Sequence, residues 1–283
     1  MMSNIEVIIP VKDEAKNLPY ALASVMQWAD RVWVVDSEST DDTCAIAAEA
    51  GAEVVVQPWL GHAKQKNWAI QNLDIKADWV FILDADEAIL PELKEELLAI
   101  ASQPTDAVNE AAFNINRYFI FLGKRIRHCG YYPSWNVRFF KRGKALYEER
   151  EVHEHMVVQG AIGKLKGHME HYDRRGLEVY MAKHNRYSTL EAKEILTQLE
   201  KKDETIDASI FGTAQQRRRW IKQYVYPKLP AKWFCRFVWM YVLRFGFLDG
   251  LTGLRFCLFI SSYELLISLK MVELKQEGGM HGS

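Results

Sequence analysis

Several features that define common functional classes are missing from this sequence of 283 residues. Its four cysteines lie far apart and form no CxxC pair, which argues against a zinc knuckle or a disulfide scaffold and is typical of a reducing cytosol. A P-loop (GxxxxGKS or GxxxxGKT) is missing, and no GxGxxG motif follows the first predicted strand. The net charge is −1, so no global excess of positive charge predicts binding to nucleic acid.

Long uninterrupted apolar runs are missing as well. The first residues enter a predicted strand almost at once, without a basic segment ahead of a long apolar run, so we expect no signal peptide. The apolar part of the C-terminal section is interrupted by charged residues at 236, 244, 255 and 264, which leaves no uncharged stretch of about 18 residues. We therefore expect helices at a membrane interface or in an oligomer, and no clean transmembrane span.

Short apolar segments alternate with segments of helical periodicity over the first hundred residues. Strands are predicted at 5–11, 32–36, 54–57 and 79–83, and helices at 15–29, 41–50, 63–73 and 91–102. This alternation indicates βαβ units and a parallel sheet that is covered on both faces. Aromatic-rich strands follow from residue 111, and one long helix is predicted at 177–202. The predicted fold class is therefore α/β, with a mostly parallel, Rossmann-like sheet flanked by helices and a helical C-terminal appendage.

Three carboxylates follow the fourth predicted strand, in the segment FILDADEAIL. Asp84, Asp86 and Glu87 would repel one another unless a cation or a proton offset their charge. The carboxyl ends of strands are where open α/β sheets bind ligands. Hard divalent cations such as Mg²⁺ and Mn²⁺ bind carboxylate and phosphate oxygens, so the segment predicts a metal together with a phosphorylated ligand. A solvated acidic turn is the alternative.

A fourth acidic residue, Asp36, ends the second predicted strand, in VVDSESTDDT. It has no capping role of its own, which favours contact with the base or ribose of a nucleotide. The hydroxyls of Ser39 and Thr40 are interpreted as caps of the following helix, and Asp41 and Asp42 as partners of its dipole.

Four segments in this order and spacing resemble the nucleotide-sugar half of family 2 glycosyltransferases with the GT-A fold: VIIPVKDEAKNL, VVDSESTDDT, GHAKQKNWAI and FILDADE. Two later segments, NVRFFKRGKALYEEREVHEHM and HMEHYDRRGLEVYMAKHNRYSTLEA, resemble a narrower group that includes bacterial lipopolysaccharide-core β-1,4-glucosyltransferases. The resemblance implies an inverting transfer from a nucleoside-diphosphate sugar, with a UDP-sugar favoured, that depends on Mn²⁺ or Mg²⁺. It also implies a glycan or glycolipid acceptor.

The resemblance also assigns roles to individual residues. It implies a nucleotide and donor site made by Pro10, Glu14, Asp36, Lys64, Asn67 and Asp84, with Asp86 on the metal. Within that set, Pro10 and Glu14 would line the nucleotide pocket, and Asp84 would contact the ribose or the donor sugar.

The catalytic base must be sought elsewhere, because the Glu-Asp pair that many members carry is missing in plain form. The candidates are Glu151, His153, Glu154 and His155. We choose Glu154, because on a strand it would share a face with Val152 and Met156, and partial desolvation would raise its pKa towards a useful value. A surface glutamate paired with an arginine is the alternative.

Two further side chains could complete the site. His171, at the end of KLKGHMEHY, could reach the metal or diphosphate beside Asp86; the alternative is a structural histidine. Arg138 could offset diphosphate charge.

The C-terminal section combines basic and aromatic residues. Residues 212–255 hold nine Lys/Arg and one acid, Asp249, and residues 220–247 hold ten aromatics. Such a composition suits single-stranded nucleic acid or an anionic membrane, and the apolar content of 233–269 favours the membrane. We therefore predict three regions: a glycosyltransferase domain at 1–175, a long helix at 176–211, and a membrane-interface or homo-oligomerisation region at 212–283.

The predicted protein is cytoplasmic and peripheral at the inner face of the plasma membrane. Two other hypotheses stay open: a polyprenyl-phosphate sugar transferase or nucleotidyltransferase, and a non-catalytic sugar-nucleotide-binding or membrane scaffold protein.

Overall fold

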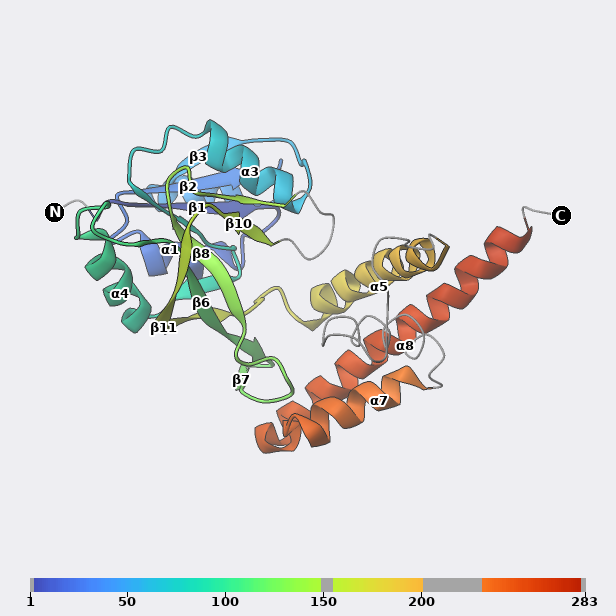
Figure 1. Cartoon of the computed structure of the whole chain (residues 1–283). Helices are drawn as coiled ribbons and strands as arrows, with labels where there is room; N and C mark the ends of the chain where they lie inside the picture. The colour runs from blue at the N-terminus through green and yellow to red at the C-terminus, as the bar shows by residue number, and fades with distance from the viewer. Residues whose placement is uncertain (1–2, 149–154, 201–230, 281–283) are drawn as a thin grey trace. The chain divides into compact units, whose positions relative to one another are not determined.

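The structure is a computed structural model that describes residues 3–148, 155–200 and 231–280 (Figure 1). The chain divides into two compact units. The first comprises residues 1–127 and 131–175, and the second comprises residues 128–130 and 176–283.

A nine-stranded mixed sheet forms the centre of the first unit. Its parallel half contains, in spatial order, β3 (Glu53–Val56), β2 (Arg31–Asp36), β1 (Ile5–Val11) and β4 (Trp79–Ile82). The sheet continues through β8 (Trp135–Lys141), β6 (Glu110–Phe121), β11 (Ala161–His171) and β5 (Glu87–Ile89), while β7 (Lys124–Ile126) pairs with β6. Strands β1 and β4 are central and apolar because both of their faces are covered.

Strand directions determine which chain segments meet at one edge of this sheet. Strand β8 is antiparallel to β4 and to β6, and β11 is parallel to β6. The carboxyl ends of β1, β2, β4, β6 and β11 therefore point the same way. Strand β5 runs antiparallel to β11 and pairs Glu87 with His171. In this way the turn after β4 comes to lie beside the end of β11.

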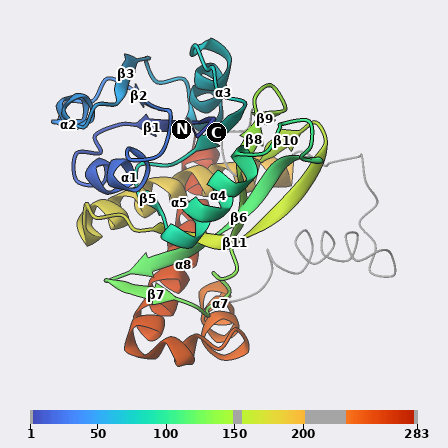
Figure 2. The same ribbon diagram turned by 90° about the vertical axis from the view of Figure 1, so that its left-hand side faces the viewer.

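Two apolar layers cover the sheet. The first packs α1 (Leu18–Val25), α2 (Thr43–Glu49) and α4 (Pro91–Ala101) against one face, and the second packs α3 (His62–Asn72) with the small sheet of β9 (Ala145–Tyr147) and β10 (Met156–Val158) against the other. Helix α4 packs against β11 (Figure 2), and Gly167 of that strand allows this approach because a Cβ there would fall 2.4 Å from the Cα of Leu93. The predicted α/β fold class is confirmed.

Several helix boundaries differ from those predicted. Helix α1 begins at Leu18, with a proline in its first turn, and ends at Val25, so it is shorter than the predicted 15–29. The loop that leads from β1 to α1 is held by hydrogen bonds to the segment after β2. Ser39 Oγ accepts a hydrogen bond from the Asp13 N–H (2.9 Å), and the Thr40 N–H donates to the Asp13 carboxylate (2.7 Å). The interpretation of Ser39 and Thr40 as helix caps was therefore wrong, because both bind the loop after β1 instead.

The second unit is helical. It contains α5 (Leu177–Glu200), α7 (Lys232–Val238), the π-helical turn η3 (Trp239–Leu243), the 3-10 turn η4 (Gly246–Asp249) and α8 (Gly250–Met280). Met240, Phe256 and Cys257 are buried in it, and His184 of α5 packs edge-on against two aromatic rings of α8. Within the ranges that the structure describes, no helix is apolar over a length that would cross a bilayer.

Candidate functional site

The carboxylates after β4 are the first part of the candidate site. Asp84 follows five consecutive core residues, Trp79 to Leu83, that are fully buried. In the register of β4 and β8, Phe81 pairs with Phe139, which places Arg138 beside the end of β4. The Arg138 guanidinium donates to Asp84 and, at 3.0 Å, to Glu87. The two carboxylates thus share one buried cation.

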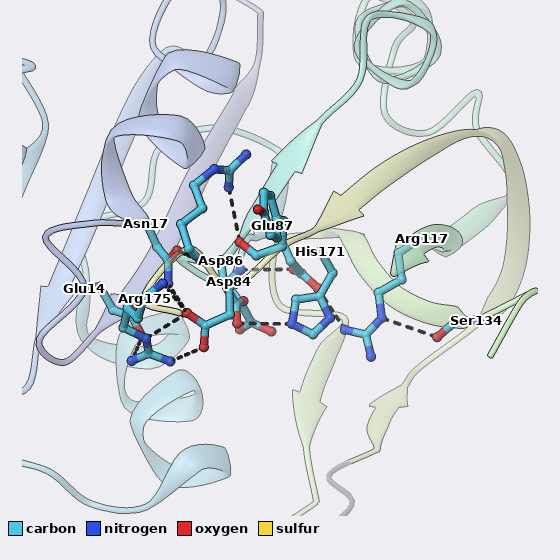
Figure 3. Close-up of polar contacts among 12 residues, drawn as sticks. Glu14, Asn17, Asp84, Asp86, Glu87, Arg117, Ser134, His171 and Arg175 are labelled. Carbon is cyan, nitrogen blue, oxygen red and sulfur yellow. Dashed lines mark hydrogen bonds and ion pairs between the residues drawn. The ribbon is translucent and has the colours of Figure 1, made fainter. Parts of the chain in front are cut away.

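Two more cations complete this cluster. Lys66 Nζ lies 3.2 Å from Asp84 Oδ1. Arg117 Nη1 lies 3.0 Å from Glu87 Oε1, and both of these residues are labelled in Figure 3. Burial by itself would raise the pKa of Asp84, but the charges of Arg138 and Lys66 outweigh burial and hold that pKa well below its usual range. The same carboxylates outweigh burial at Arg138 and raise its pKa well above the usual value. Each charge of this pair thus stabilises the ionised form of the other.

Asp86 points to a different partner. Its Oδ2 lies 3.1 Å from His171 Nε2, across 85 residues of sequence (Figure 3). The two side chains come together because Glu87, next to Asp86, pairs with His171 in the register of β5 and β11. Backbone contact supports the arrangement, since the Tyr172 N–H donates to the Asp86 carbonyl at 2.8 Å. Both residues that the sequence predicted as metal ligands therefore converge at one point.

A second charged cluster adjoins this pair. Arg175 Nη1 lies 2.8 Å from Glu14 Oε1, and the same guanidinium binds Asp173 at 2.7 Å and 2.9 Å (Figure 3). Asn17 donates to both carboxylates, at 2.8 Å to Glu14 and 3.0 Å to Asp173. Burial raises the pKa of Glu14 to about 7, against the opposing effects of Arg175 and Asn17, and the Asp86 carboxylate adds to the rise. Glu14 therefore holds its proton to a higher pH than an ordinary glutamate does.

Asp36 is buried at the end of β2. Only 1% of its surface is exposed, and its Oδ2 accepts a hydrogen bond from the Ser39 N–H at 2.9 Å. The Cys44 thiol is its neighbour, and burial together with the Asp36 carboxylate raises the pKa of that thiol. Asp36 thus holds the loop after β2, and its contact with a nucleotide base stays a prediction. Pro10 of β1, which pairs with Val35 in the register of β1 and β2, is partly exposed.

Helix α3 carries the predicted Lys64 and Asn67. Lys64 is exposed, whereas Lys66, two positions on and on another side of the helix, binds Asp84. Both amide atoms of Asn67 bind the backbone of Tyr147, at 2.9 Å and 2.8 Å, and so connect α3 to β9. Contact of Lys64 and Asn67 with a nucleotide stays a prediction.

The predicted base lies outside the described residues. Glu154 and two alternatives, Glu151 and His153, belong to segment 149–154. The remaining alternative, His155, is described and is exposed.

Residues that the sequence did not single out also help to build the site. These are Asn17, Lys66, Arg117, Asp173 and Arg175. Asn17 and Lys66 lie inside motifs quoted above, and Asp173 and Arg175 shortly follow the strand that ends in His171. The sequence signal that could have found most of these residues is a charged side chain two or three positions from a predicted ligand.

Comparison with known proteins identifies the class to which this site belongs. Residues 6–173 match the model of glycosyl transferase family 2, and the chain belongs to this family, as the motifs predicted. Its activity is accordingly glycosyl transfer from a nucleotide sugar, as in that family. The matched range contains all the residues of the two charged clusters described above except Arg175.

Individual proteins and solved structures are also similar to this chain. An uncharacterized glycosyltransferase of Rickettsia felis is 33% identical over 214 residues, which are 70% of this chain and 72% of that protein. A mannosyltransferase from Pyrobaculum calidifontis, solved with GDP-Man and Mn²⁺, is 15% identical to this chain. The match covers 95% of this chain and 87% of the mannosyltransferase chain, with a TM-score of 0.49. Glucosyl-3-phosphoglycerate synthase from Mycobacterium tuberculosis, solved with Mn²⁺ and UDP, is 22% identical, with coverage of 41% and 44% and a TM-score of 0.32.

Proposed function

We propose that this glycosyltransferase moves a sugar, with inversion, from a nucleoside-diphosphate sugar to a lipid-linked, lipopolysaccharide or polysaccharide acceptor, and that it uses Mn²⁺ or Mg²⁺. A UDP-sugar is the favoured donor. The observation that carries the proposal is the 3.1 Å approach of Asp86 and His171 beside the paired Asp84, Glu87 and Arg138. The narrower choice of acceptor depends on the sequence resemblance alone.

The charges of the site support a divalent cation. The two clusters contain five carboxylates (Glu14, Asp84, Asp86, Glu87 and Asp173) and four basic groups (Lys66, Arg117, Arg138 and Arg175). These basic groups are already paired with the carboxylates, so they leave no excess of positive charge for a diphosphate. A divalent cation between Asp86 and the diphosphate would supply that charge.

The residues at hand fit a cation that binds together with the donor. Asp86 provides a carboxylate, which binds Mn²⁺ or Mg²⁺, and His171 an imidazole, which suits a transition-metal ion such as Mn²⁺ better than Mg²⁺. Within the described ranges no third His, Cys, Asp or Glu completes a metal cluster, so the remaining positions suit diphosphate oxygens and water. When bound, the cation would act as a Lewis acid that stabilises the leaving diphosphate.

The chain's own residues orient the reactants. The Arg138 and Lys66 cations hold Asp84 ionised and in place, so that its oxygens can accept hydrogen bonds from ribose or donor-sugar hydroxyls. The side chain of Glu87 is unexposed and binds Arg117 and Arg138, so it positions these two cations. The acceptor hydroxyl would lose its proton to Glu154 as its oxygen attacks the anomeric carbon from the face opposite the diphosphate, which inverts the configuration.

The proposed acceptor also gives the helical unit a role. Residues 212–255 are basic and aromatic, and such a composition binds anionic lipid surfaces. We therefore include peripheral association with the inner face of the plasma membrane in the proposal, since a lipid-linked acceptor would be presented there.

A product assay tests the proposal and separates its rivals. Full-length protein is incubated with a set of nucleoside-diphosphate sugars, Mn²⁺ and bacterial lipid extract, and the released nucleotide product is identified. Release of a nucleoside diphosphate is expected, and a glycosylated polyprenyl phosphate as the product would show a polyprenyl-phosphate sugar transferase. In a parallel reaction with nucleoside triphosphates and sugar 1-phosphates, release of pyrophosphate would show a nucleotidyltransferase.

Matched variants connect this assay to the site. Asp86→Asn should lose most of the activity, whereas Asp106→Asn, which changes an exposed carboxylate outside the clusters, should keep it. Full activity of the wild-type protein in excess EDTA would refute the proposed dependence on a divalent cation. A protein that binds donors and releases no product with any of them would favour the scaffold hypothesis.

A further inference from the structure

The turn between α7 and α8 exposes an unusual concentration of large apolar side chains. We call residues 242–251 the apolar tip of the helical unit, and Figure 1 shows it where the orange and red helices meet. Its exposed side chains are Val242 49%, Leu243 63%, Phe245 56%, Phe247 46%, Leu248 60% and Leu251 59%. Monomeric soluble proteins seldom expose contiguous apolar surface of this kind without a binding partner.

The only acid of this segment does not contribute charge to the outer surface. Asp249 is 6% exposed at its side chain. Its carboxylate accepts hydrogen bonds from the His128 backbone N–H and faces His128 Nδ1, both at 2.9 Å. Within residues 231–263 it is the sole Asp or Glu. The outer surface of the tip therefore carries apolar groups and positive charge.

The positive charge lies at and just behind the tip. Arg244 is exposed within it and packs its guanidinium over the Trp239 ring, with 4.9 Å to the ring centroid. Arg255, also exposed, follows Leu251 by one helical turn, which is about 6 Å along α8. Arg236 precedes the tip on α7. An apolar end with arginines one or two turns behind it matches the depth profile of a bilayer, where apolar side chains enter the acyl boundary and arginines stay among the headgroups.

From these contacts we propose that the apolar tip inserts into one leaflet of a bilayer that contains anionic phospholipid. This inference rests on the membrane association proposed above and assigns it to ten residues. The chemistry favours lipid over a second copy of the chain, because self-association of the tip would bring Arg244 and Arg255 of two copies together, whereas anionic headgroups offset them.

Vesicle sedimentation of the full-length protein tests the insertion. Binding to vesicles of phosphatidylcholine mixed with phosphatidylglycerol is expected at low salt, with weaker binding to phosphatidylcholine alone. Leu248→Glu places a charge at the tip and should lower the partition coefficient by at least about tenfold. Wild-type protein that ignores both kinds of vesicle would overturn the proposal.

Leu269→Glu is the matched control. Leu269 is 57% exposed on the same helix and lies 18 residues beyond Leu251, about 27 Å away. The Leu269→Glu protein should bind vesicles as strongly as wild-type protein does. Equal loss in both variants would show that α8 lies flat on the surface, and no loss in either would show that the tip is not inserted; either result refutes insertion by the tip.

Two further measurements separate this inference from the others. Sedimentation velocity without lipid should give the same mass for wild type and Leu248→Glu; a dimer that dissociates in the variant would identify a self-association surface instead. Donor hydrolysis without lipid should be unchanged in Leu248→Glu, which also shows that the variant is folded. Because hydrolysis needs no vesicles, failure of the glycosyltransferase proposal would be seen there and not in the binding assay.

Discussion

Asp86 and His171 are separated by 85 residues in sequence, yet Asp86 Oδ2 lies 3.1 Å from His171 Nε2. The contact follows from the antiparallel pairing of β5 with β11, which sets Glu87 opposite His171. The turn after β4 and the last strand of the sheet thus contribute one side chain each to the proposed metal site.

If both side chains bind one ion, their substitutions should not be additive. We expect His171→Ala and Asp86→Asn each to weaken Mn²⁺ binding, measured calorimetrically with UDP present, by at least about tenfold. The double variant should be weakened by less than the product of the two single effects. A His171→Ala protein that binds Mn²⁺ like wild type would show that the histidine only hydrogen-bonds to Asp86.

Lys66 and Lys64 provide a comparison within one helix. Lys66→Met removes the cation 3.2 Å from Asp84 and should weaken donor binding by about tenfold, because hydrogen bonds to charged groups contribute about 1.5–3 kcal/mol. Lys64→Met removes an exposed cation and should change the donor Kd little. The opposite ranking in a nucleotide titration would restore Lys64 as the donor-binding lysine.

Arg138 should be important for stability as well as for the site. Arg138→Met keeps a long side chain but leaves Asp84 and Glu87 without their shared cation, which we expect to cost about 3–5 kcal/mol in the free energy of unfolding. Arg142→Met removes a half-exposed arginine whose nearest acid, Asp78, is 4.0 Å away, and should cost less than about 1 kcal/mol. Urea denaturation of both variants measures the difference, and equal losses would contradict the central role of Arg138.

The raised pKa of Glu14 predicts that the stability of the fold depends on pH. Its pKa is about 7 in the folded chain and 4.5 ordinarily, so between these values the folded state binds more protons than the unfolded state. The free energy of unfolding should therefore fall as pH rises through this window, by about 3 kcal/mol in total. Without metal, Glu14→Gln should lose this decline in urea titrations at pH 5 and pH 8, while the exposed-site control Glu95→Gln should keep it. A decline that persists in Glu14→Gln would contradict the assignment.

The predicted base can be tested although it lies outside the described residues. Glu154→Gln keeps the shape of the side chain and removes its basic oxygen, so donor binding should survive while turnover falls by at least about 10²-fold. Glu151→Gln serves as the matched control, measured with the same donor and acceptor. If the turnover of Glu151→Gln falls and that of Glu154→Gln does not, Glu151 is the base.

The sequence by itself determined the fold class and the residues at the ends of single strands. Apolar runs such as 79–83 must be buried, and the acidic residues that directly follow them must lie at the edge of the sheet. Local order along the chain is enough for such inferences, which explains why Asp84 and Asp86 could be selected before the structure was known.

Only the tertiary structure decided which charges meet. The pairing of Asp84 with Lys66 and Arg138, and of Glu14 with Arg175, depends on strand order and register, to which residues far apart in sequence contribute jointly. Lys64 and Lys66 are alike in sequence, but the rotation of α3 directs only Lys66 to Asp84. The inward position of Asp249 likewise depends on His128, 121 residues away, and it leaves the outer surface of the apolar tip without negative charge.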